Sequence, residues 1–297
     1  MKSGAYFFLL LFLSCMNTDS RQLIVQGHRG CRGSLPENTL PAFLRAIEMG
    51  VDVLELDVVC TSDRRILISH DPFMHHEICA FPDGSLIDES AEQSLNIYQM
   101  TSDSAQSYIC GSIPHPRFPL QRQIPTRKPL LSELLELAKQ ESSNPNRPFP
   151  ALSIEIKSRP EWDGLFQPQV EEFTQLFIQE LIGYENVRVS VQSFDPRILR
   201  SIHEINRSIP LTFLTEDSTL SAEQQLKSLP FKPIAYSPHF SMVDVKLVDF
   251  CRRENMELVV WTVNEEKDIL EMIHIGVRNL ISDYPERIIA IRDSLSR

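Results

Sequence analysis

Residues 27–71 read GHRGCRGSLPENTLPAFLRAIEMGVDVLELDVVCTSDRRILISHD and hold the end of one strand, a helix and a second strand. The apolar residues of Thr39–Met49 recur with helical spacing, with Thr39 placed to cap the helix and Gly50 to stop it. Val53–Val59 is apolar on both faces, which predicts a buried strand. Polar side chains lie at the ends of these apolar runs. Burying polar side chains there costs free energy unless a charged group binds to them.

The alternation of short apolar strands and amphipathic helices continues to the end of the chain. Eight such units in this length predict a TIM (β/α)8 barrel. An open doubly wound sheet is the alternative, but no glycine-rich phosphate loop follows the first strand. The strands are expected at Leu23–Gln26, Val53–Val59, Ala151–Ile156, Val187–Val191, Leu211–Leu214, Ile234–Tyr236, Leu258–Trp261 and Leu280–Ile281, and the helices at Thr39–Met49, Leu130–Gln140, Gln169–Ile182, Pro196–Asn206, Ala222–Leu229, Val245–Arg253, Glu265–Ile275 and Pro285–Ser294.

Residues 72–128 interrupt this alternation. Prolines, serines and isolated hydrophobic residues follow one another there without a sustained period, after a short extended piece at Arg65–Ser69. A structureless loop of this length is unusual inside a compact domain. We therefore expect an insertion after the second barrel strand, folded as a small subdomain or lid, within a single domain that spans residues 22–297.

The first residues are expected to be a targeting segment. Lys2 precedes a short apolar block, Ala5–Leu13, that is too short to span a bilayer and is typical of a secretory signal. The following residues resemble a bacterial lipoprotein processing site, in which Cys15 would carry the lipid and residues 1–15 would form the signal region. Ordinary cleavage after a small residue is the alternative. An exported protein, anchored by lipid to a bacterial membrane in the cell envelope, is the expected location.

The formal net charge is −11 and no Lys/Arg run occurs, so a nucleic-acid-binding function is not expected. An acidic protein can still bind an anionic substrate if the anion is met locally by a metal or a few basic side chains. The six cysteines contain no C-x-x-C pair, which argues against a zinc ribbon or a thioredoxin motif. A bond between Cys79 and Cys110 is possible, and Cys31, Cys60 and Cys251 are expected to be small buried residues.

Chemistry-bearing residues gather where barrel strands are expected to end. Glu55 and Asp57 are two apart on one strand, so both point to the same side, and the same holds for Glu155 and Lys157. Three clustered carboxylates without a cysteine ligand favour a hard divalent cation, Mg²⁺ or Ca²⁺. Gln192 follows the fourth strand.

A cation beside two basic groups, Arg29 and Lys157, is a natural receptor for a phosphate ester. His28 and His70 can then act as a proton acceptor and a proton donor. Lys157 has a structural alternative, a simple pair with Glu155, and Trp261 is as compatible with the core as with a substrate contact. The remaining histidines are expected to be surface or structural residues: His75, His76, His115, His203, His239 and His274.

An ordered set of short motifs resembles the glycerophosphodiester phosphodiesterase family over about Gln22 to Ile291. The set is His28-Arg29-Gly30, Pro36-Glu37-Asn38-Thr39, Glu55-Leu56-Asp57, His70-Asp71-Pro72, Glu155-Ile156-Lys157, Gln192-Ser193-Phe194-Asp195, Trp261-Thr262-Val263-Asn264 and Ser282-Asp283-Tyr284-Pro285. The resemblance implies a TIM barrel with an insertion after the second strand. It also implies hydrolysis of a small glycerophosphodiester to glycerol 3-phosphate and an alcohol.

The resemblance further implies a role for each motif residue. Attack on phosphorus by the glycerol 2-hydroxyl would give a cyclic phosphate that water then opens, so that two histidines exchange the acid and base roles. The implied roles are metal binding by Glu55, Asp57 and Glu155, acid/base catalysis by His28 and His70, phosphate contact by Arg29 and Lys157, and further substrate contact by Gln192 and Trp261.

Some residues depart from the family pattern, and other functions stay open. Cys31, Arg32, Asn279, Leu280 and Ser282 differ from the residues common in the family, and we expect these changes to affect the rim of the site. One alternative is a phospholipase D-like barrel that acts on lysophospholipid headgroups. Another is a non-catalytic envelope lipoprotein that binds phosphorylated ligands, which the full set of site residues argues against.

Overall fold

The computed structural model describes residues 22–141 and 149–295, and eight of its strands close into a parallel barrel. The first strand, β1, pairs in parallel with both the second strand and the last, so that the sheet has no open edge there. The predicted TIM barrel is therefore confirmed. The barrel strands are β1 (Ile24–Gly27), β2 (Val53–Cys60), β6 (Ala151–Ile156), β7 (Val189–Ser193), β8 (Leu211–Thr215), β9 (Ala235–Pro238), β10 (Glu257–Val260) and β11 (Asn279–Ser282).

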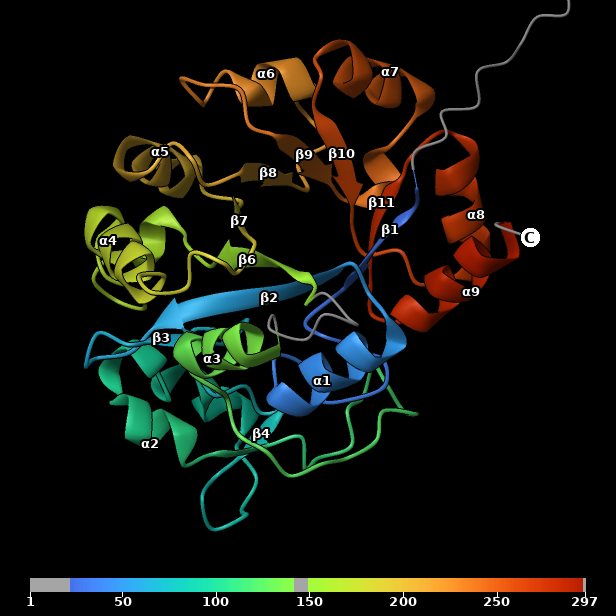
Figure 1. The fold of residues 1–297 in the computed structure, drawn as a ribbon. Coiled ribbons are helices and arrows are strands. Elements are labelled where there is room, and N and C mark those ends of the chain that lie inside the picture. Colours follow the sequence, from blue (N-terminus) through green and yellow to red (C-terminus); the bar gives the residue numbers. More distant parts are fainter. Residues whose placement is uncertain (1–21, 142–148, 296–297) are drawn as a thin grey trace, which may run out of the picture.

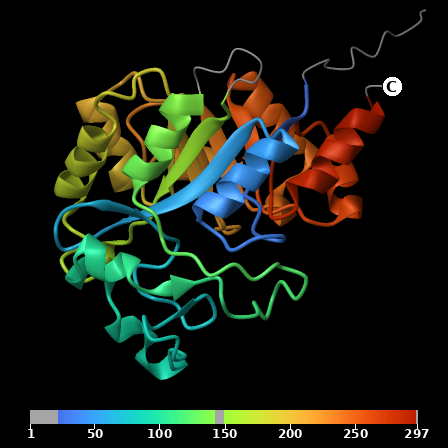
Figure 2. The same ribbon diagram turned by 60° about the horizontal axis from the view of Figure 1, so that its bottom comes forward.

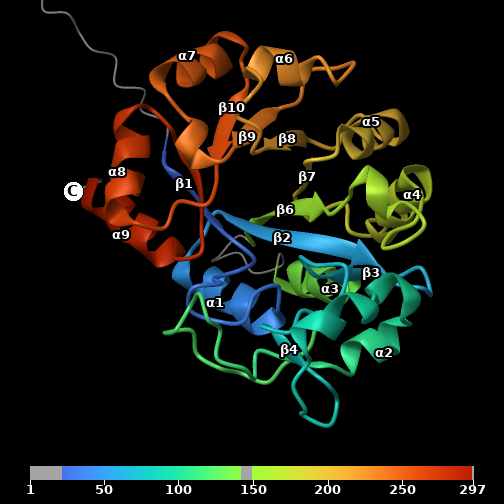
Figure 3. The same ribbon diagram turned by 180° about the vertical axis from the view of Figure 1, so that it is seen from behind.

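Helices surround the barrel on the outside, as Figures 1 and 3 show from opposite directions. They lie within one or two residues of the predicted ranges, except that the helix predicted at Ala222–Leu229 ends at Leu226, three residues earlier than expected. The helices are α1 (Leu40–Met49), α3 (Leu131–Glu141), α4 (Val170–Glu180), α5 (Pro196–Ile205), α6 (Ala222–Leu226), α7 (Val245–Arg253), α8 (Glu266–His274) and α9 (Pro285–Leu295). Two single-turn 3-10 helices, η3 (Pro160–Trp162) and η4 (Phe240–Met242), lie in the connecting loops.

The residues that begin and end helix α1 explain the local structure of the first strand–helix unit. Thr39 accepts a hydrogen bond from the backbone N–H of Ala42, and Gly50 ends the helix in the left-handed conformation with φ 86°. The turn before it depends on Gly30, whose φ is 92°. A Cβ on Gly30 would lie 2.8 Å from the backbone carbon of Ala42, so only glycine lets the turn that carries His28 approach α1 this closely.

The segment between the second and third barrel strands has its own short elements. After β3 (Ile66–Ile68), which pairs antiparallel with β2, come β4 (Cys79–Ala80), η1 (Glu89–Ser94), η2 (Ile97–Gln99), α2 (Ser102–Gln106) and β5 (Ile109–Cys110). Strands β4 and β5 pair with each other and are joined by a Cys79–Cys110 disulfide. Buried residues that include Met74, Ile87 and Ile97 form a small separate core. Figure 2 shows this segment, in teal and green, gathered on one side of the barrel.

The predicted signal region, with Cys15 and its lipid, lies outside the described residues. Cys31, Cys60 and Cys251 are buried free thiols, as expected. Within residues 22–141 and 149–295, no helix combines the length and apolar character that crossing a membrane requires.

Candidate active site

The site residues predicted from the sequence surround a single cavity of about 690 Å³. Its walls come from the ends of the barrel strands and from the loop after β3, which contributes Pro72 and Phe73. Asp57 lies just below this surface and is almost fully buried. The predicted residues that line the cavity are His28, Arg29, Glu55, His70, Glu155, Lys157, Gln192 and Trp261.

Three buried carboxylates form the floor of the site. Asp57 and Glu155 are cross-strand partners on β2 and β6, and Glu55 stands two residues before Asp57. Each offers an oxygen atom, and these oxygens all lie within 4.8 Å of one another. Glu55 accepts hydrogen bonds from the Arg29 backbone N–H at 3.0 Å and from Gln192 Nε2 at 2.9 Å. The carboxylates are thus fixed in place before any ligand binds.

Nearby cations balance the charges of this trio only in part. Burial, together with the neighbouring Asp57 and Glu155 charges, raises the pKa of Glu55 well above its ordinary value. Burial also raises the pKa of Glu155 to about 7, although Lys157 opposes this. Burial acts in the same direction on Asp57, but the charges of Arg29, His70 and Lys157 and the hydrogen bond from Asn38 together outweigh it, and the pKa of Asp57 is lowered. All three can ionise together only beside further positive charge, and an all-oxygen set of this kind fits Mg²⁺ or Ca²⁺.

His28 is oriented by Asp283, a residue for which no role was predicted from the sequence. Nδ1 of His28 lies against Oδ1 of Asp283, whose other oxygen accepts a hydrogen bond of 2.8 Å from Asn264 Nδ2. The contact exists because β1 and β11 are neighbours, with Gly27 opposite Ser282. Burial lowers the pKa of His28, while Asp283 opposes that shift. The Ser282–Pro285 motif, which begins at the last residue of β11, was the signal that could have identified Asp283.

His70 is held in a similar way by its own neighbour. Nδ1 of His70 lies 3.0 Å from Oδ1 of Asp71. Burial, followed by the charges of Arg29 and Lys157, lowers the pKa of His70 to about 4. Both histidines therefore have a carboxylate at Nδ1, and Nε2 is the other titratable nitrogen of each ring. Nε2 of His28 accepts a hydrogen bond of 3.3 Å from Nε of Arg29.

The basic side chains are tied to acidic partners. Arg29 donates from Nη1 to Glu37 Oε1 at 2.7 Å, and its Nε lies 3.3 Å from Oδ2 of Asp57. Nζ of Lys157 lies 2.8 Å from Oε1 of Glu155, so the predicted pair forms, yet Lys157 also lines the cavity. Arg32, a third cation on the wall, also pairs with Glu37.

The Pro36–Thr39 run has structural roles that its sequence did not reveal. Glu37 pairs with both Arg29 and Arg32, and Asn38 donates to Asp57 Oδ2 at 2.8 Å. Thr39 is the cap of α1. The Pro36–Thr39 run therefore fixes the side chains of Arg29 and Asp57 in the site.

Gln192 and Trp261 differ in what they contact. Gln192 lies within β7, one residue before the strand's end, and its amide holds Glu55. Trp261 donates from Nε1 to the carbonyl oxygen of Ser237 at 3.0 Å and packs edge-on against Phe194 on the cavity wall.

The expectation that the atypical residues affect the rim is correct for Arg32 and wrong for the others. Cys31 is fully buried against α1, where its thiol contacts the carbonyl oxygen of Ala42. Asn279 accepts a hydrogen bond from Gln26 inside the barrel, and Leu280 and Ser282 are buried. These three residues of β11 are buried because each residue of a barrel strand faces either the barrel interior or the surrounding helices.

Comparisons with known proteins agree on one family. The model of the glycerophosphoryl diester phosphodiesterase family matches residues 28–287. A glycerophosphodiester phosphodiesterase from Bacillus altitudinis is 29% identical over 90% of this chain and 97% of its own length. A solved structure from Silicibacter pomeroyi superimposes with a TM-score of 0.82 and 27% identity, over 93% of this chain and 94% of its own.

A phosphodiesterase from Oleispira antarctica, solved with the product sn-glycerol-3-phosphate, has a TM-score of 0.71 and 21% identity. It covers 91% of this chain and 96% of its own. At this identity the likeness shows the shared barrel fold.

Proposed function

We infer the reaction from one premise: the chain belongs to the glycerophosphoryl diester phosphodiesterase family. It is a phosphoric diester hydrolase that converts glycerophosphodiesters to glycerol 3-phosphate and an alcohol. We propose that the cavity lined by His28, His70 and Lys157 is its active site. The observation that carries this proposal is that carboxylates, cations and two histidines from distant parts of the chain meet in that one cavity.

Glu55, Asp57 and Glu155 are proposed to hold the divalent cation, Mg²⁺ or Ca²⁺. The close approach of their buried oxygens and the raised pKa values of Glu55 and Glu155 support this assignment. When bound there, the cation would supply positive charge to the phosphoryl oxygens and increase the electrophilicity of phosphorus.

His28 and His70 are proposed to exchange protons with the substrate through Nε2. The carboxylates of Asp283 and Asp71 hold the proton on Nδ1, so a neutral ring presents its lone pair at Nε2. A neutral histidine can remove the proton from the attacking hydroxyl. The negative charge of a bound phosphodiester favours protonation of an imidazole beside it, which prepares the second histidine to protonate the leaving oxygen.

Arg29 and Lys157 are proposed to bind the phosphate. Both side chains line the cavity, and both carry their charge beside the carboxylate trio. Gln192 would act on the substrate through Glu55, and Trp261 would form an apolar wall next to Phe194.

The test is release of glycerol 3-phosphate from glycerophosphocholine by purified protein. We expect activity with Mg²⁺ or Ca²⁺, none with excess EDTA, and a loss of about 10²–10⁴-fold in His28→Ala because an acid/base group contributes that much. His274→Ala is the matched control, since His274 is exposed on α8 outside the cavity. Full activity of folded His28→Ala protein, or of EDTA-treated protein, would contradict the proposal.

Lysophosphatidylcholine serves as the second substrate in the same assay. Phe73, Trp162 and Phe194 line the cavity and offer apolar surface to an acyl chain. We expect glycerophosphocholine to be the better substrate. Preferential release of choline from the lysophospholipid would instead assign the enzyme to lysophospholipid headgroups.

We also propose export and a lipid anchor on Cys15, from the signal-like residues 1–15. Metabolic labelling with a fatty acid should mark the wild-type protein and leave Cys15→Ser unlabelled. An unlabelled wild-type protein would favour ordinary signal cleavage.

A further inference from the structure

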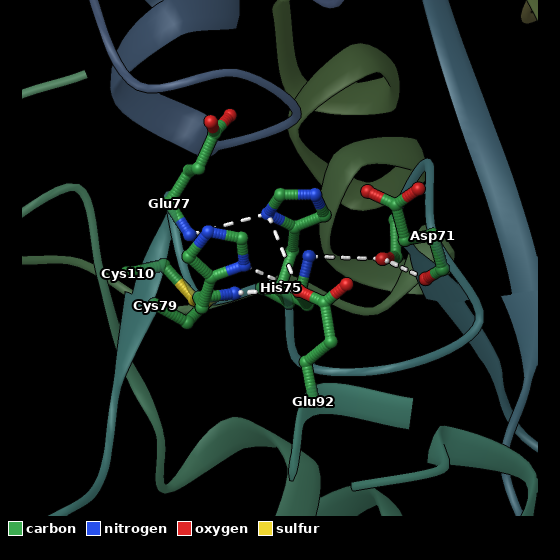
Figure 4. Close-up of a disulfide and its surroundings, with 9 residues drawn as sticks. Asp71, His75, Glu77, Cys79, Glu92 and Cys110 are labelled. Atoms are coloured by element: carbon green, nitrogen blue, oxygen red, sulfur yellow. Dashed lines mark hydrogen bonds and ion pairs between the residues drawn. A yellow bond between two sulfur atoms is a disulfide. The ribbon is translucent and has the colours of Figure 1, made fainter. Parts of the chain in front are cut away.

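A second group of metal-ligand side chains lies outside the proposed active site. Among the residues that the structure describes, only two groups of at least three such side chains bring their ligand atoms within 4.8 Å of one another. One is the carboxylate trio on the barrel floor. The other is His75, His76 and Glu92, in the segment that follows β3. Figure 4 shows His75 and Glu92 facing each other beside the Cys79–Cys110 disulfide.

The distances within this group suit a small cation with nitrogen ligands. Oε2 of Glu92 lies 2.7 Å from Nδ1 of His76 and 3.8 Å from Nδ1 of His75. Bonds of about 2.0–2.2 Å to a tetrahedral Zn²⁺ separate neighbouring ligand atoms by roughly 3.3 Å. The two observed distances lie on either side of that value. Small side-chain rotations would therefore complete the geometry, with the weak 3.2 Å hydrogen bond from the Glu77 N–H to His75 Nδ1 given up.

The backbone around the three side chains is already fixed. The carbonyl oxygen of His75 accepts hydrogen bonds from the N–H groups of Ile78 and Cys79, and Cys79 is held by the disulfide. The N–H of His76 donates to Oε2 of Glu92 at 3.1 Å. The two imidazole rings stack with centroids 4.9 Å apart. Ordering these groups on metal binding would thus cost little entropy.

A plain ion pair between His76 and Glu92 accounts for only part of this arrangement. Such a pair does not require the second imidazole, His75, to lie against the same carboxylate oxygen. All three side chains are partly exposed, at 20%, 26% and 13%, so an ion can enter and keep a water as its fourth ligand.

We propose that His75, His76 and Glu92 form a second metal site, specific for Zn²⁺ over Mg²⁺ and Ca²⁺. Two imidazoles and one carboxylate form a ligand set that zinc uses, whereas Mg²⁺ and Ca²⁺ prefer oxygen ligands alone. The ion would tie the loop after β3 to η1. Because Phe73 stacks on His75 and lines the active-site cavity, zinc would also fix one wall of that cavity.

The first test is equilibrium dialysis of untagged, metal-stripped protein against Zn²⁺ in an excess of Mg²⁺. A Glu155→Gln background removes one ligand of the carboxylate trio, so that zinc bound there does not obscure the result. We expect the parent protein to bind one Zn²⁺ per chain. The His76→Ala and Glu92→Ala variants should bind Zn²⁺ about tenfold more weakly or worse, since each loses a direct ligand. His203→Ala is the control and should bind zinc like the parent. Equal zinc binding in the parent, His76→Ala and Glu92→Ala would overturn the proposal.

A second test needs no substitution and so does not depend on folding of a variant. Diethyl pyrocarbonate modifies accessible histidine nitrogens, and mass spectrometry of peptides locates the modification. Zn²⁺ should protect the peptide that contains His75 and His76, while Mg²⁺ should not. Equal modification with and without Zn²⁺ would overturn the proposal, whatever the outcome of the phosphodiesterase assay, which requires no zinc.

Discussion

At the scale of single residues, the position of His28 depends on a side chain at the far end of the sequence. Asp283 lies 255 residues away and meets Nδ1 of His28 because the barrel closes between β11 and β1. Burial favours the neutral acid, but the charges of His28 and Arg32 and the hydrogen bonds from His28 and Asn264 together outweigh it, and the pKa of Asp283 is lowered to about 2. An ionised Asp283 accepts a hydrogen bond from Nδ1–H of His28, which favours the His28 tautomer that is protonated on Nδ1.

Replacing Asp283 by asparagine should reduce kcat by about 10²–10⁴-fold with little change in KM, because the amide can donate to Nδ1 and stabilise the wrong tautomer. Steady-state kinetics on glycerophosphocholine measure this. Asp283 is a positioning residue in this account, so the double variant with His28→Ala should be no slower than His28→Ala alone. Multiplied losses in the double variant would show that Asp283 acts independently.

The sequence correctly predicted the positions of side chains whose neighbours follow from local periodicity. The two-residue spacing on β2 correctly placed Glu55 and Asp57 on one side, and Glu155 joins them in the structure. The sequence did not predict a side chain's hydrogen-bond or ion-pair partner where that partner depends on strand order or on a turn. Asp283 and Glu37 are such cases, because one is brought in by barrel closure and the other by the left-handed turn at Arg29, with φ 50°.

At the scale of helices and strands, caps and periodicity determined what could be predicted. The barrel helices have apolar stripes and residues that signal their ends, so their predicted bounds agree closely with the observed ones. Within residues 72–128 the elements are only two to six residues long, and the three helical ones begin at the local caps Asp88, Asn96 and Thr101. Such short elements carry no measurable period, so the sequence indicated an insertion without its fold.

Helix α5 offers a test of how much one cap contributes. Asp195 accepts from the Arg197 N–H at 2.9 Å, and it also pairs with the Arg197 side chain and accepts from Ser158 Oγ at 2.8 Å. Asp195→Ala should lower the free energy of unfolding by about 2–4 kcal/mol, the sum of a lost cap and lost buried polar contacts. Urea unfolding measures this change, provided that wild type and Asp195→Ala have the same m-value.

Asp244→Ala is the matched control for that experiment. Asp244 caps α7 by accepting from the Leu247 N–H at 2.8 Å, but it is exposed and only the cap is lost. We expect a cost of about 1 kcal/mol there. Equal costs at Asp195 and Asp244 would mean that the buried contacts of Asp195 contribute nothing to stability.

At the largest scale, this acidic protein gathers several basic side chains around one cavity. The formal net charge is −11, yet Arg29, Arg32 and Lys157 all line the same cavity. Counting strand–helix units was enough to predict the barrel. The same count predicted that the strand ends converge and that the candidate residues meet there, but it did not predict the ion pairs that each charged side chain forms.

Proton linkage connects the carboxylate trio to the stability of the whole protein. Glu155 has an ordinary pKa of 4.5, which burial raises to about 7 in the folded, cation-free protein. Between these values the folded state binds more protons at this site than the unfolded state, so the contribution of Glu155 to stability falls as pH rises. His70, whose pKa is lowered from 6.5 to about 4, contributes with the opposite sign over an overlapping range.

Comparing wild type with Glu155→Gln isolates the Glu155 contribution, because His70 is common to both proteins. In EDTA, the unfolding temperature of Glu155→Gln relative to wild type should rise as pH increases from 4.5 to about 7 and then level off. Saturating Mg²⁺ should reverse the order at the upper end, because a cation that binds only the folded wild type stabilises it. Thermal unfolding monitored by circular dichroism measures both series. A difference that is independent of pH and of Mg²⁺ would mean that Glu155 neither titrates abnormally nor binds the cation, since both properties follow from the same uncompensated negative charge.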